Sequence, residues 1–151
     1  MPEILTVNGK EYKIIKLLGK GKGGYSYLAE SDCTRVVLKQ IHHEPCDYYT
    51  FGNKIEAERF DYGRLLDTGI RIPKMFDIDI PNERIVKEYI DGPTVMDLVN
   101  QGNLSEDIID QAREMSEKAN HFKYFTDLQC LKADLPTVTF SFELSITISR
   151  L

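Results

Sequence analysis

The chain has no long apolar segment and no excess of basic residues. No run of 18 apolar side chains occurs in its 151 residues, and the amino terminus, Met1-Pro2-Glu3, has neither a basic start nor an apolar core. The sequence therefore predicts no membrane-spanning segment and no signal peptide. Lys and Arg number 19 against 24 Asp and Glu, for a net charge of −5. Because nucleic-acid-binding domains usually carry a basic excess, we expect no nucleic-acid partner. Because no long apolar segment occurs, we also expect no membrane partner.

Cysteine is also scarce. The three cysteines, Cys33, Cys46 and Cys130, are odd in number and irregularly spaced, which argues against a disulfide framework and favours a reducing, cytoplasmic location. His42-His43-x-x-Cys46 contains zinc-ligand residue types, but no second ligand pair follows at suitable spacing. We therefore predict no metal site there and expect a polar loop instead.

Glycine is concentrated in one segment near the amino terminus, Leu18-Gly19-Lys20-Gly21-Lys22-Gly23-Gly24-Tyr25. Glycines at positions 19, 21 and 24 would let backbone amides approach phosphate oxygens and would allow positive φ. The pattern predicts a phosphate-binding turn made by Gly19, Lys20, Gly21 and Gly24. A tight β-turn needs glycines as well, so a purely structural role stays open beside the phosphate-binding one.

The residues after this turn have the pattern of strands. Tyr25 to Glu30 is followed by a short polar turn and by a second strand-like segment, Thr34 to Ile41, which ends in Val37-Leu38-Lys39-Gln40-Ile41. Consecutive strands joined by short turns are antiparallel. The P-loop and the dinucleotide-binding fold both place a helix after their glycines, so neither fits this order.

Three motifs together resemble the amino-terminal lobe of the protein-kinase-like superfamily, as found in bacterial serine/threonine-kinase-like proteins. They are Gly19-x-Gly21-x-x-Gly24, Val37-Leu38-Lys39 and the segment Val86-Lys87-Glu88-Tyr89-Ile90-Asp91-Gly92, and the resemblance covers about residues 12 to 100. It implies an α+β fold in which a small lobe, an antiparallel sheet with one helix, precedes a partial helical lobe. It also implies that ATP binds, accompanied by Mg²⁺.

The resemblance assigns Lys39 to the α- and β-phosphates and pairs it with a glutamate on the single helix, for which residues 50–66 are the candidate. Glu58 lies on the apolar stripe of that segment and Glu56 lies off it, so Glu58 is the predicted partner. The stripe consists of Ile55, Tyr62, Leu65 and Leu66. The alternative is that both glutamates are ordinary solvated charges.

Two further strands, Met75 to Ile80 and Arg84 to Ile90, complete the predicted sheet. The resemblance implies that Glu88 and Ile90 offer the adenine a backbone carbonyl and amide. Lys87 departs from the family pattern, because that position usually carries an uncharged side chain at the back of the pocket.

The second half of the chain lacks the catalytic motifs of the family. Asp127 is followed five residues later by Lys132 in place of an asparagine, and Asp134-Leu135-Pro136 does not match the metal-binding triplet. Because phosphoryl transfer depends on these positions, we assign no catalytic residue and no side-chain ligand for Mg²⁺.

The last segment alternates strictly: from Thr137 to Ser149 every even position is apolar and every odd position is polar. The pattern predicts a strand over 137–149. Either this strand pairs with a sheet edge or another chain, or the reading frame has shifted near residue 120. The predicted organisation is a nucleotide-binding lobe (1–90), a partial helical lobe (91–123) and a divergent tail (124–151).

Three functions follow from these observations. The first is a kinase-type phosphotransferase, whose phosphoryl acceptor stays open and could be a protein. The second is a catalytically inactive, pseudokinase-like regulatory module that binds ATP. The third is a non-catalytic interaction module that uses its sheet and tail for strand addition. Apolar surface left uncovered by a missing lobe would favour a homodimer.

Overall fold

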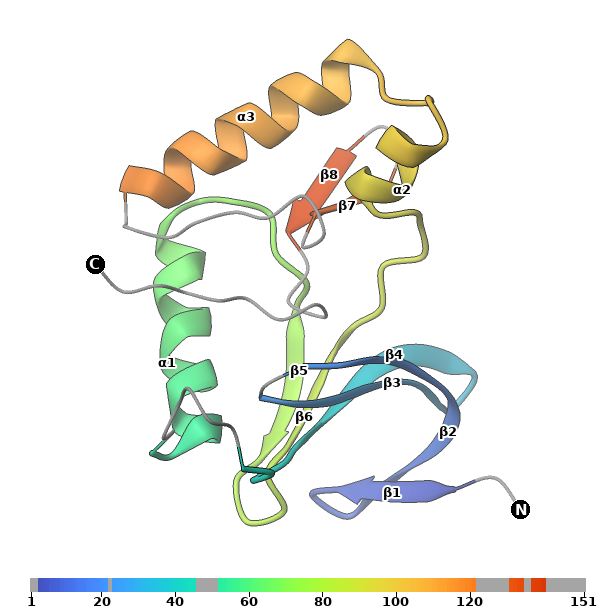
Figure 1. Ribbon diagram of the computed structural model, residues 1–151. Helices are drawn as coiled ribbons and strands as arrows, with labels where there is room; N and C mark the ends of the chain where they lie inside the picture. The colour runs from blue at the N-terminus through green and yellow to red at the C-terminus, as the bar shows by residue number, and fades with distance from the viewer. Residues whose placement is uncertain (1–2, 22, 46–51, 122–130, 135–136, 141–151) are drawn as a thin grey trace. The chain divides into compact units, whose positions relative to one another are not determined.

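The computed structural model describes residues 3–21, 23–45, 52–121, 131–134 and 137–140. The chain forms two compact units (Figure 1). The first contains Met1–Asp61 and Lys74–Tyr89, and the second contains Tyr62–Pro73 and Ile90–Leu151. No helix in the described ranges is both long and apolar enough to cross a membrane.

The first unit is built on a six-stranded sheet in the order β1-β2-β3-β4-β6-β5. Every pair of neighbouring strands is antiparallel, and the long strands curl strongly in Figure 1. The strands are β1 (Ile4–Val7), β2 (Lys10–Lys20), β3 (Gly24–Ser31), β4 (Thr34–Ile41), β5 (Met75–Asp79) and β6 (Arg84–Glu88). The four strands predicted between residues 25 and 90 are confirmed with small differences at their ends, and the sequence analysis missed β1.

Short hairpin turns explain why consecutive strands pair. Asn8 and Gly9 between β1 and β2 have φ angles of 47° and 83°. Asp32 and Cys33 between β3 and β4 have φ angles of 51° and 61°. Two consecutive residues with positive φ are the requirement of a type I′ turn, whose twist matches that of the two strands.

Alternation along β4 divides its side chains between the two faces of the sheet. Leu38 and Val36 belong to a buried cluster with Val7, Tyr12, Ala29 and Val86. Ile41, on the opposite face, packs with Ile85 of β6 and with Ile55. Since Lys39 alternates in phase with Ile41 and is the register partner of Ile85, the lysine lies on the face that Ile55 covers.

Ile55 belongs to α1 (Lys54–Asp67). The Asn53 side chain accepts a hydrogen bond from the Glu56 amide at 3.2 Å, and such a cap explains why the helix begins at Lys54 and not at residue 50 as predicted. Ile55 and Leu65 are buried as predicted, but Leu66 is 53% exposed. Its assignment to the buried stripe is therefore wrong.

The second unit contains two further helices and a small sheet. Helix α2 (Val95–Asn100) begins with a capping box between Thr94 and Asp97, and α3 (Glu106–His121) follows it. Strands β7 (Leu131–Asp134) and β8 (Thr137–Phe140) pair antiparallel. The remainder of the predicted strand 137–149 lies outside the described residues.

The α+β class is confirmed by this combination of an antiparallel sheet and separate helices. The finer expectation of a kinase-like small lobe is not confirmed, because short antiparallel hairpins and one covering helix occur in many folds. The domain boundaries at residues 90 and 123 stay a prediction.

Candidate functional site

The glycine turn joins β2 to β3 within the first unit. Gly19 is the register partner of Ser26, and Lys20 is that of Tyr25. The Gly21 amide donates to the Gly24 carbonyl at 2.9 Å. That hydrogen bond closes the hairpin and uses one of the amides that the sequence analysis assigned to phosphate binding.

Gly24 is required by the sheet itself. A Cβ at this position would lie 2.4 Å from the backbone carbonyl oxygen of Gln40, far inside van der Waals contact. Among the described glycines, positive φ is recorded at Gly9, Gly69 and Gly102, so the positive φ that glycine would allow is not used at Gly24. The structural role left open for the turn therefore accounts for Gly24.

Gly23 has a different environment from its neighbour. A Cβ there would lie 3.4 Å from Glu58 Oε1 and 3.5 Å from Lys39 Nζ. The backbone at Gly23 thus faces the side chains of Lys39 and Glu58, and no side chain at position 23 separates it from them. The sequence analysis did not select Gly23, because the G-x-G-x-x-G spacing passes over it.

Lys39 of β4 and Glu58 of α1 form an ion pair in which Lys39 Nζ donates to Glu58 Oε1. Their side chains are 14% and 24% exposed. Glu56 contacts Arg59 at 3.7 Å on the helix surface instead. The predicted choice of Glu58 over Glu56 is confirmed as a contact, while a role of the pair in nucleotide binding stays a prediction.

Lys87 of β6 approaches the other oxygen of the same carboxylate, with Nζ 3.6 Å from Glu58 Oε2. It is the register partner of Val37, two residues before Lys39, so both lysines lie on one face of the sheet. Burial alone would raise the pKa of Glu58, but the charges of Lys39 and Lys87 outweigh it and hold the pKa below its ordinary value. Glu58 is therefore ionised at neutral pH.

A second, more exposed contact joins the two strands of the turn to Glu44, in the segment after β4. Lys20 Nζ lies 2.6 Å from Glu44 Oε2, with the two side chains 49% and 46% exposed. The Tyr25 hydroxyl donates to Glu44 Oε1. The hydrogen bond from Lys20 lowers the pKa of Glu44 and raises the pKa of Lys20.

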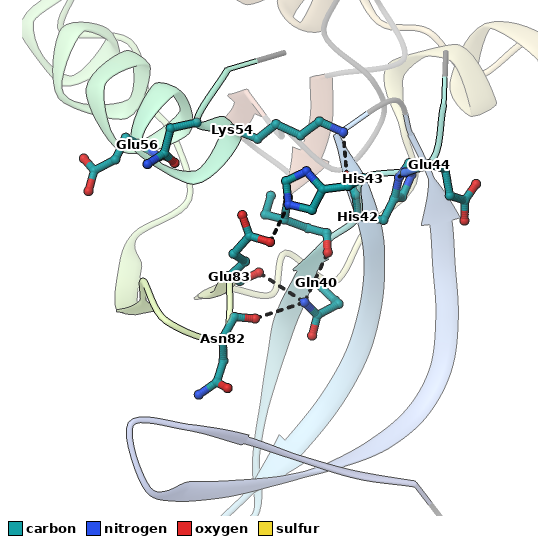
Figure 2. A network of polar contacts seen from close by, with 10 residues as sticks. Gln40, His42, His43, Glu44, Lys54, Glu56, Asn82 and Glu83 are labelled. Carbon is teal, nitrogen blue, oxygen red and sulfur yellow. Dashed lines mark hydrogen bonds and ion pairs between the residues drawn. The ribbon is translucent and has the colours of Figure 1, made fainter. Parts of the chain in front are cut away.

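His42 ties the segment after β4 back to the glycine turn. Its Nε2 lies 3.0 Å from the Gly21 carbonyl, and its Nδ1 accepts from the Glu44 amide at 3.2 Å. Because Nδ1 accepts, Nε2 must carry the proton and donate to Gly21. The backbone carbonyl of His42 accepts from Lys54 Nζ at the start of α1 (Figure 2).

His43 contacts the turn between β5 and β6, where its Nε2 lies 2.6 Å from Glu83 Oε2. Gln40 Nε2 contacts the same turn and donates to the Asn82 carbonyl at 3.1 Å. Figure 2 shows these contacts joining β4 to the β5–β6 turn. Within the described ranges no three His, Cys, Asp or Glu side chains gather in a way that could hold a metal ion. Cys46 lies outside those ranges.

The residues predicted to contact adenine are Glu88 and Ile90. The Glu88 amide donates to the Lys74 carbonyl at 2.8 Å, and its side chain accepts from the Lys74 amide at 3.1 Å. Ile90 is 4% exposed. Their contact with a base stays a prediction, and Asp127 lies outside the described residues.

The chain has a short similarity to a known protein. No family model matches the chain. Over 38 residues the chain is 47% identical to a probable bifunctional tRNA threonylcarbamoyladenosine biosynthesis protein of Methanococcus vannielii, a match that spans 25% of this chain and 7% of that relative.

This result corrects the family assignment made from the motifs. The assignment to the protein-kinase-like superfamily, as a bacterial serine/threonine-kinase-like protein, is wrong, because the similarity found is to a tRNA-modification protein over 25% of the chain. The reason is visible in the turn: Gly24 is fixed by the approach of Gln40, so part of the glycine spacing reflects hairpin packing. What the comparison establishes is similarity over a quarter of the chain to a tRNA-modification protein.

Proposed function

We propose that the first unit binds the phosphates of ATP at the glycine turn, with Lys39 as the principal phosphate ligand. The observation that carries this proposal is the position of Gly23, whose backbone faces the Lys39–Glu58 pair. Glu58 orients the ammonium group of Lys39, and Gly23 leaves the space next to that group free of a side chain. An anion could therefore contact the ammonium group and the backbone of the turn together.

One further feature of the turn favours phosphate over a neutral ligand. Lys20 places a second ammonium group on the strand that enters the turn, and its exposed contact with Glu44 costs little to exchange for a phosphate. Mg²⁺ would enter with the nucleotide through its phosphate oxygens. We propose no side-chain ligand for it.

The proposal is a nucleotide-binding module and not a complete phosphotransferase, because no catalytic residue is assigned in the chain. The name of the partial relative favours a part in tRNA modification, and we propose that this cytoplasmic module supplies nucleotide binding to such a system. With a net charge of −5, we expect it to act beside other protein chains and not to hold the RNA itself.

The test is calorimetric titration of the full chain with magnesium-ATP, comparing wild type with Lys39→Ala. We expect the variant to bind at least about tenfold more weakly, equivalent to about 1.4 kcal/mol. Lys10→Ala is the matched control, because Lys10 pairs with Asp32 at 2.9 Å in an exposed position away from the turn. Equal affinity of wild type and Lys39→Ala, or no binding by wild type, would contradict the proposal.

A further inference from the structure

Lys87 is a buried cation in the middle of the sheet. Its side chain is 8% exposed, and it stands on β6 opposite Val37 of β4. Lysines are almost never fully buried, because removing the ammonium group from water costs several kcal/mol unless a partner compensates it. Here Glu58 lies on the same face of the sheet and supplies one such partner.

Glu58 divides its two oxygens between two lysines. Oε1 accepts from Lys39, and Oε2 lies 3.6 Å from Lys87. The Lys39 ammonium lies next to the backbone of the glycine turn, 3.5 Å from the position that a Cβ of Gly23 would take. Lys39 therefore lies beside the proposed phosphate position, and Lys87 contacts the carboxylate oxygen of Glu58 that Lys39 does not contact.

An entering phosphate changes the electrostatic balance of this cluster. Its negative charge attracts Lys39 and repels Glu58, and both effects are large in a partly buried site. If Lys39 were the sole cation beside Glu58, turning toward the phosphate would leave a buried carboxylate with a weakened partner, which is costly. A second cation that stays on Oε2 removes that cost.

We infer that Lys87 is a positioning residue, which holds the Glu58 carboxylate in place so that Lys39 can engage a phosphate. This inference rests on the proposed function, since it assigns Lys87 a part in the same phosphate site. It also gives a role to Lys87, which the sequence analysis noted as a departure from the family pattern. The depressed pKa of Glu58, caused in part by Lys87, agrees with it.

The experiment is a double-mutant cycle on magnesium-ATP affinity with Lys87→Met, Glu58→Gln and the double variant of the full chain. Lys87→Met removes the charge at similar length, and we expect it to weaken binding about tenfold in the wild-type background and hardly at all in the Glu58→Gln background. Unchanged affinity in Lys87→Met would overturn the inference. An equal loss in both backgrounds would also overturn it, because Lys87 would then act on the phosphate directly.

A second measurement needs no nucleotide. Carboxyl-carbon NMR titration of Glu58 is expected to give a higher pKa in Lys87→Met than in wild type, and an unchanged pKa overturns the inference even if ATP binds. Conversely, if Lys87→Met raises the pKa of Glu58 but the wild-type chain does not bind ATP, the positioning contact stands and only the proposed function is overturned. If Lys87→Met does not fold, Lys87→Arg takes its place, and a large loss of ATP affinity despite the retained charge overturns the inference.

Discussion

Two lysine–glutamate contacts flank the glycine turn, and they differ in burial. In the inner contact, Lys39–Glu58, the side chains are 14% and 24% exposed. In the outer contact, Lys20–Glu44, they are 49% and 46% exposed. Water screens the outer charges, so forming or losing that contact changes little. The inner charges have lost much of their hydration and compensate each other. Removing one of them therefore destabilises the fold, although the chemical groups are the same as in the outer contact.

The largest expected effect concerns Gly24, at the start of β3. Gly24→Ala would place Cβ 2.4 Å from the Gln40 carbonyl, and this overpacking should lower the free energy of unfolding by about 3 kcal/mol. Urea denaturation measures it. Gly23→Ala is the adjacent control, because its nearest atoms lie at 3.4 and 3.5 Å and belong to flexible side chains. Equal losses from the two substitutions would show that the register of β3 against β4 is not what requires Gly24.

The inner contact should give the next largest effect. Glu58→Gln keeps the shape of the side chain but removes the negative charge shared by Lys39 and Lys87. We expect the free energy of unfolding to fall by about 2 kcal/mol, because two partly or fully buried ammonium groups lose a compensating charge. The same urea series measures this, and a variant as stable as wild type would mean that the inner contact behaves like a surface pair.

The pH dependence of stability separates the inner contact from other acid-sensitive groups. The pKa of Glu58 is held below its ordinary value of 4.5, so the unfolded chain takes up this proton at a higher pH than the folded chain. The stabilisation is therefore fully present above pH 4.5 and is lost as the pH falls through the folded-state pKa. Unfolding free energies of wild type and Glu58→Gln measured from neutral pH into acid should converge. Parallel curves would contradict this assignment.

The smallest effect is expected at the outer contact. Glu44→Gln removes the charge that faces Lys20 and Tyr25, yet the melting temperature at physiological salt should stay within error of wild type, because exposed pairs are screened. Differential scanning calorimetry measures it. A decrease as large as that in Glu58→Gln would remove the distinction between the two contacts.

The sequence predicted the strands better than the ends of the helix. Thr34 to Ile41 was predicted with the observed bounds, because alternation and flanking turn residues are local signals. β1 was missed, although Asn8-Gly9 is a strong hairpin signal and could have revealed it. The start of α1 was placed at residue 50 because the cap at Asn53 was overlooked. A capping residue fixes the position at which a helix begins.

Part of the candidate site was also predictable. The choice of Glu58 for Lys39 followed from the helix face, a periodic property that the sequence displays. The opposite roles of Gly23 and Gly24 could not be predicted, because one faces a side-chain pair and the other a backbone carbonyl. Lys87 looked like a departure from a family pattern, and its approach to Glu58 depends on the pairing of β4 with β6.

The sequence by itself determined the local elements of this protein: where strands alternate, where two-residue turns reverse the chain, and which helix face is apolar. These follow from backbone sterics and side-chain period, which act over a few residues. Only the tertiary structure decided that Lys39 and Lys87, 48 positions apart by their numbers, converge on one carboxylate. Strand register and the seating of α1 set that geometry, and both arise from packing between segments distant in the chain.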